Sequence, residues 1–114
     1  MTANWVVFEQ GTTLGQIGSE GGCILRDDEY KDEARITLEK DGQTAPFSIT
    51  CGISGWMCHT RFFSTLSEAE MAYIQMQEAI VTIVELIPYK TDAELEQKMR
   101  QVENAISHFV ECFP

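Results

Sequence analysis

The pattern of apolar and polar residues changes once along the chain, near Ser64, from a period of two to a period of about 3.6. Before that point, short β-branched and aromatic stretches alternate in polarity, as strands do. After it, apolar residues recur at spacings of three and four, as in amphipathic helices. The chain has no internal repeat and no Pro- or Ser-rich linker, so we expect residues 1–114 to form a single domain.

Four to five strands are expected between residues 4 and 63. Residues 34–40 alternate clearly, with Ala34, Ile36 and Leu38 on one face. Asp41-Gly42 follows, and Asp-Gly between alternating strands is a strong hairpin signal. A two-residue turn there would place Ile36 opposite Phe47, so that apolar residues meet across the pair. An antiparallel β-meander is the expected result.

The next turn is expected at Ser54-Gly55. If it also has two residues, Cys51 faces Cys58 on the core side, and Thr50 faces His59 on the other side. The two cysteines would then be neighbouring thiols beneath the helices, with Cα atoms close enough for a disulfide.

Two helices are predicted after the strands, over about 67–87 and 92–112. Ser67-Glu68-Ala69-Glu70 and Thr91-Asp92-Ala93-Glu94 both have the form of a capping box. Pro88 ends the first helix. Strands followed by a helical pair predict an α+β fold, in which a C-terminal αα-hairpin packs on one sheet face.

The other sheet face is the candidate ligand or partner face. In the predicted register it carries hydroxyls, an imidazole and two or three arginines, in the set Arg35, Ser48, Thr50, His59, Arg61 and Arg26. Planar guanidinium groups match carboxylates and phosphates, so such a face could bind an anion. The alternative is an ordinary solvated face, since exposed polar residues are normal on antiparallel sheets.

The charge balance narrows the range of partners. Eighteen acidic and eight basic residues give a net charge of −10, which repels nucleic acids and anionic membranes but suits a basic protein partner. The most apolar run, 79–87, is too short to cross a bilayer. The N-terminus has no pattern of a secretory signal, so a cytoplasmic location with reduced thiols is expected.

Cys51, Cys58 and His59 lie within nine residues and raise the question of a metal site. Adjacent strand residues point to opposite faces, so Cys58 and His59 cannot ligate one metal within a regular strand. No paired cysteine or histidine spacing typical of zinc accompanies them. We therefore expect no metal and no cofactor.

Residues 11–22 hold five of the eight glycines. Their backbone N–H groups could cradle an anion. The segment matches neither common glycine-rich phosphate-binding motif, so a flexible or bulged connection between strands is the favoured interpretation.

No known catalytic motif is present, so an enzyme is not favoured. The sequence instead favours a small acidic binding or protein-interaction module without catalytic activity, acting through the open polar face or an edge strand. One alternative is an enzyme or binding protein for an anionic small molecule, with a site around His59, Arg35 and Arg61. Another is a structural homo-oligomer, such as a homodimer, in which two open faces pack together.

Overall fold

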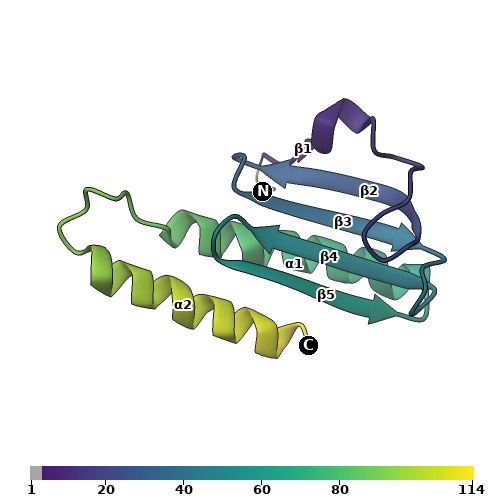
Figure 1. The fold of residues 1–114 in the computed structure, drawn as a ribbon. Coiled ribbons are helices and arrows are strands. Elements are labelled where there is room, and N and C mark those ends of the chain that lie inside the picture. Colours follow the sequence, from purple (N-terminus) through teal and green to yellow (C-terminus); the bar gives the residue numbers. More distant parts are fainter. Residues whose placement is uncertain (1–3) are drawn as a thin grey trace.

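The computed structural model describes residues 4–114 and contains one antiparallel sheet followed by two helices (Figure 1). The sheet order is β1-β2-β3-β4-β5, with all neighbouring strands antiparallel. The elements are β1 (Val6–Val7), the 3₁₀ turn η1 (Phe8–Gly11), β2 (Cys23–Tyr30), β3 (Ala34–Lys40), β4 (Phe47–Ile53), β5 (Met57–Phe63), α1 (Leu66–Leu86) and α2 (Leu95–Cys112). The predicted α+β fold, a meander followed by a helical hairpin, is confirmed.

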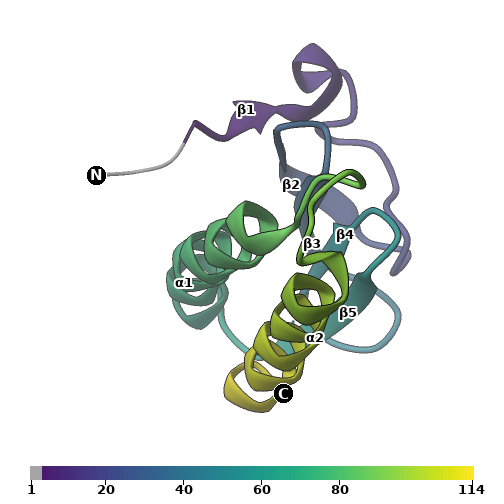
Figure 2. The same ribbon diagram turned by 90° about the vertical axis from the view of Figure 1, so that its left-hand side faces the viewer.

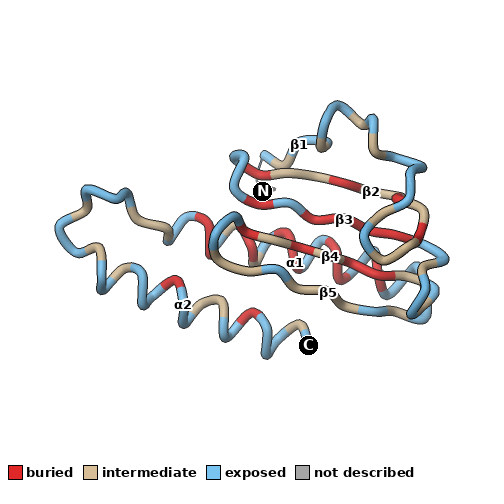
Figure 3. Tube along the Cα trace, in the orientation of Figure 1, coloured by how far each residue is buried: buried red, intermediate tan, exposed pale blue. Residues whose placement is uncertain are grey.

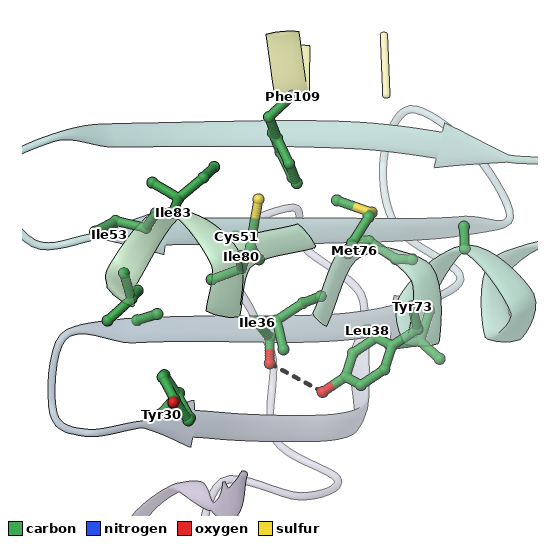
Figure 4. Packing of buried hydrophobic residues seen from close by; sticks show 14 of the residues in the cluster. Tyr30, Ile36, Leu38, Cys51, Ile53, Tyr73, Met76, Ile80, Ile83 and Phe109 are labelled. Carbon is green, nitrogen blue, oxygen red and sulfur yellow. Dashed lines mark hydrogen bonds between the residues drawn. The ribbon is translucent and has the colours of Figure 1, made fainter. Parts of the chain in front are cut away.

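Both helices lie on the same side of the sheet (Figure 2). The apolar stripe of α1 packs on β3 and β4 and forms most of the core, with Tyr73, Met76 and Ile80 fully buried (Figure 4). By contrast, α2 buries only Val102 and Phe109, and most of its length is exposed or half-buried (Figure 3). Neither helix within residues 4–114 is long and apolar enough to span a membrane.

Each helix begins at a cap different from the predicted one. Thr65 caps α1, because its hydroxyl accepts a hydrogen bond from the Glu68 backbone N–H at 3.2 Å and donates to the Glu68 carboxylate. This capping box lies two residues before the expected start at Ser67. The second helix begins at Leu95, and its N-cap residue Glu94 makes no side-chain capping hydrogen bond. The Glu94 N–H instead donates to the Asp92 carboxylate in the turn before the helix, so the capping box expected at Thr91 does not form.

The β3–β4 connection is a six-residue loop over 41–46 rather than a two-residue turn. Lys40 pairs with Phe47, and Ile36 faces Cys51 instead of Phe47. The longer loop keeps Pro46, which has no N–H, out of the strand ladder. It also lets the Gln43 N–H donate to the Glu20 carbonyl at 3.0 Å. The register differs from the prediction by four residues, an even number, so each side chain of β3 and β4 keeps its predicted face.

The β4–β5 connection has three residues, over 54–56, one more than predicted. The extra residue turns the side chains of β5 to the opposite face of the sheet. Ile53 pairs with Met57, the Trp56 N–H donates to the Ile53 carbonyl at 2.9 Å, and Gly55 has φ +78°. A two-residue hairpin turn would require positive φ at Ser54, which a residue with a side chain avoids, and Ser54 keeps negative φ. Every residue of β5 therefore points to the face opposite the predicted one.

Candidate functional site

The face away from the helices is only half open. The segment over 8–22 passes from β1 across this face, on the side opposite α1 (Figures 1 and 2). It covers the β2 and β3 side through contacts with two buried carboxylates, and leaves the outer part of β4 and β5 uncovered. These two carboxylates, Asp27 and Glu39, hold the covering segment in place.

Asp27 is only 1% exposed and accepts four hydrogen bonds. Arg35 donates from Nε at 2.8 Å and from Nη2 at 2.6 Å, and the hydroxyls of Thr37 and Thr13 donate at 3.0 and 2.8 Å. Burial alone would raise the pKa of the Asp27 carboxyl, but these hydrogen bonds outweigh burial and hold the pKa below its usual value. The Arg35 guanidinium also lies 3.8 Å from the Phe8 ring centroid. Asp27 therefore ties η1 and its following turn to the sheet.

Glu39 is also 1% exposed, and the glycine-rich segment wraps around its carboxylate. The Gly22 N–H donates to Oε1 at 3.0 Å, and the Glu20 N–H reaches both oxygens at 3.2 and 3.3 Å. A Cβ on Gly18 would lie 2.4 Å from the Glu39 carboxyl carbon, so any side chain there would push the carboxylate away from its donors. Backbone N–H groups of this segment thus do surround an anion, the less favoured of the two sequence interpretations, and that anion is a side chain of the protein itself.

Two depressions remain on this face, on either side of Arg35. The larger is a groove of about 410 Å³ between the covering segment and β3–β5, and its polar lining includes Thr13, Gln16, Ser19, Arg35 and Thr50, with Cys58 also contributing. The second depression, of about 380 Å³, lies between the β2–β3 and β4–β5 turns. Phe8, Arg35 and Met57 form part of its wall, together with the carboxylate-bearing residues Glu29, Asp32 and Glu33. We call it the acidic recess.

Three of the six predicted face residues lie on this open face: Arg35, Ser48 and Thr50. Thr50 shares a hydrogen bond with Thr60 across β4–β5, with 3.2 Å between the hydroxyl oxygens. The Ser48 hydroxyl is buried and has no hydrogen-bond partner within residues 4–114. Of these three residues, only Arg35 and Thr50 line the groove.

The other three predicted residues, His59, Arg61 and Arg26, lie on the helix side. Arg26 stacks 4.3 Å from the centroid of Tyr73 in α1. His59 contacts the Phe113 carbonyl, and Arg61 donates to the Pro114 carbonyl at 3.2 Å, so both hold the end of α2 against β5. The prediction that all six share one face is wrong, because reversal of β5 moves His59 and Arg61, and Arg26 faces Leu38 in the core-side row. Arg35 therefore cannot converge with His59 and Arg61 on one ligand.

The two central cysteines also separate. Cys51 faces His59 and is 1% exposed, whereas Cys58 faces Gly52 on the open side and is exposed. Burial raises the pKa of the Cys51 thiol to about 12. The predicted Cys51–Cys58 pair on the core face is therefore wrong, and side chains on opposite faces cannot form a disulfide.

Comparisons of the chain with known protein families, with curated proteins and with solved structures found no match. Function must therefore be argued from the open face alone.

The residues that organise this face were not singled out from the sequence. Asp27 and Glu39 were not distinguished from ordinary surface acids. Phe8 was expected in the first strand, over 5–10, and Thr13 in the glycine-rich connection. One signal was available for Asp27: it lies opposite Thr37 and diagonal to Arg35 once β2 and β3 are paired. The sequence contained no comparable signal for Glu39, because its partners are backbone N–H groups.

Proposed function

We propose that this domain is a non-catalytic binding module that holds a basic protein partner on its open sheet face. The carrying observation is the charge of the acidic recess. Arg35 is the one cationic side chain that lines either depression, and Asp27 already binds it through two hydrogen bonds. Glu29, Asp32 and Glu33 have no ion-pair partner within residues 4–114. The recess thus offers free carboxylates to a lysine or arginine side chain.

The surroundings of the recess suit a protein better than a small anion. The adjacent groove presents hydroxyls for hydrogen bonds, and Ile17 in its wall is 74% exposed. Phe62, on the same face of the sheet opposite Ser48, is 45% exposed. An anion at Arg35 would compete with Asp27, which already accepts two hydrogen bonds from the guanidinium, and would be repelled by the carboxylates of the acidic recess. The net charge of −10 adds long-range attraction for a basic partner and accelerates its approach.

A selection from a random peptide library displayed on phage, with the whole chain as bait, tests this proposal. We expect enrichment of peptides with clustered lysine and arginine. Their affinity should fall at least about tenfold in the triple variant Glu29→Gln, Asp32→Asn, Glu33→Gln, because three charge pairs are lost.

The matched control removes three exposed helix carboxylates by Glu70→Gln, Glu78→Gln and Glu103→Gln. Both triple variants change the net charge from −10 to −7, so they differ only in where the charge is removed. The control should bind basic peptides nearly as well as the parent. Enrichment without basic residues, or equal losses in both variants, would contradict a site at the recess.

A further inference from the structure

The last two turns of α2 carry a histidine and a cysteine on one side of the helix. His108 and Cys112 are four residues apart, so they are neighbours on the helix surface. The Cys112 Sγ lies 3.4 Å from the His108 Nε2, and both residues are exposed. Neither residue belongs to the open sheet face described above.

The spacing of these two atoms is that of two ligands on one zinc ion. Zinc binds thiolate sulfur at about 2.3 Å and imidazole nitrogen at about 2.0–2.1 Å, with tetrahedral angles. Two such ligands on one ion are therefore about 3.5 Å apart. The observed 3.4 Å, at which the thiol and the imidazole share a hydrogen bond, is close to this separation. Imidazole and thiolate are also the ligand types that zinc prefers.

One chain supplies only half of such a site. Within residues 4–114, no group of three or more His, Cys, Asp or Glu side chains is placed to hold a metal. Structural zinc sites have four protein ligands, so two positions would remain. A second copy related by a two-fold axis through the metal brings the same two ligands and completes a Cys₂His₂ set.

The surface around the pair suits contact with a second copy. His108 and Cys112 line an apolar recess of about 280 Å³ between α1 and α2, whose other lining residues are Ala79, Thr82, Ile83, Ala105, Phe109 and Phe113. Two chains of charge −10 repel each other, so contact through this apolar surface depends on the dication.

We propose that His108 and Cys112 form half of a zinc site that joins two copies of this chain through their α2 helices. Together the two chains supply two thiolates and two neutral imidazoles, and the two thiolate charges neutralise one Zn²⁺. The open sheet face remains free in this arrangement, so the zinc site and the proposed partner face are independent.

Metal titration of the reduced chain of residues 1–114 tests the proposal. We expect one Zn²⁺ per two chains, and a mass in solution that rises from 12.9 kDa with EDTA to twice that value with zinc. Co²⁺ in place of zinc should give the visible absorption of tetrahedral cobalt with thiolate ligands. His108→Ala and Cys112→Ser should each weaken zinc binding more than about 100-fold, since loss of a second-shell partner alone costs about 10–100-fold.

Cys58→Ser is the matched control, because it removes the other exposed thiol from a distant face. Its zinc affinity and zinc-dependent mass should equal those of the parent. Circular dichroism should show that all three variants keep their helices. A dimer that persists in EDTA, one zinc bound per single chain, or undiminished binding by Cys112→Ser would overturn the proposal. In EDTA, His108→Ala and Cys112→Ser should bind basic peptides as tightly as the parent does. The test of the zinc site and the test of the sheet face can therefore fail independently.

Discussion

Replacing the carboxylate of Glu39 probes whether the glycine-rich segment is held by a buried anion. Glu39→Gln keeps the shape of the side chain and can keep one oxygen in front of the Gly22 and Glu20 N–H groups. Hydrogen bonds to a charged group contribute about 1.5–3 kcal/mol, and neutral ones about 0.5–1.5 kcal/mol. We therefore expect Glu39→Gln to lower the free energy of unfolding by about 1–2 kcal/mol.

Glu39→Ala should cost more, because it leaves two donors without an acceptor. Each buried unsatisfied group costs about 1–3 kcal/mol, so a loss of about 2–6 kcal/mol is expected for the two donors. Urea unfolding followed by tryptophan fluorescence measures both variants, with Trp5 and Trp56 as reporters. Glu70→Gln is the control: it removes an exposed carboxylate and should change stability by less than about 0.5 kcal/mol.

Gly18→Ala tests whether the loss of stability comes from the hydrogen bonds between the Glu39 carboxylate and the backbone N–H groups around it. The added Cβ would lie 2.4 Å from the Glu39 carboxyl carbon and displace the carboxylate from its donors. Since both changes break the same hydrogen bonds, the double variant Gly18→Ala, Glu39→Gln should be less destabilised than the sum of the two single variants. If Glu39→Gln were as stable as the parent, the desolvation of the carboxylate would equal its hydrogen-bond energy, and the reasoning would be refuted.

Two further predictions concern other buried groups. The pKa of Asp27 is held below its usual value of 3.8, so its contribution to stability is present above about pH 4 and is lost as the pH falls through the lowered pKa; urea midpoints measured from pH 7 to pH 2 should fall less steeply in Asp27→Asn than in the parent. Cys51 should react with iodoacetamide more than about a thousandfold more slowly than Cys58, because it is buried and its pKa is raised to about 12; equal rates, read by mass spectrometry of peptides, would restore the predicted pairing of the two cysteines.

The order of elements was predictable from the sequence because periodicity reports it directly. Alternation in 34–40 and the spacing of apolar residues after Ser64 were sufficient for a meander and a helical hairpin. The faces of β3 and β4 were also predictable, since an error of four residues in register leaves the alternation intact. The caps were less certain, because Thr65 and Ser67 both precede a glutamate by three residues.

The orientation of β5 was not predictable from its residues. One alternating set holds Cys58, Thr60 and Phe62, and the other holds Met57, His59, Arg61 and Phe63, so each has apolar members and neither is clearly the core set. The length of the preceding loop decides between them. That length depends on whether Ser54 adopts a negative or a positive φ angle, which amino-acid composition does not indicate.

One residue in that loop determines the chemistry of the open face. A two-residue turn would have placed His59 and Arg61 beside Arg35 and made the face attractive to anions. With three residues, Arg61 instead stacks on Phe63 and Phe113, where burial lowers the pKa of its guanidinium. The face then keeps Arg35 bound to Asp27, next to the free carboxylates of the acidic recess. The proposed preference for a basic partner therefore rests on hairpin geometry as well as on net charge.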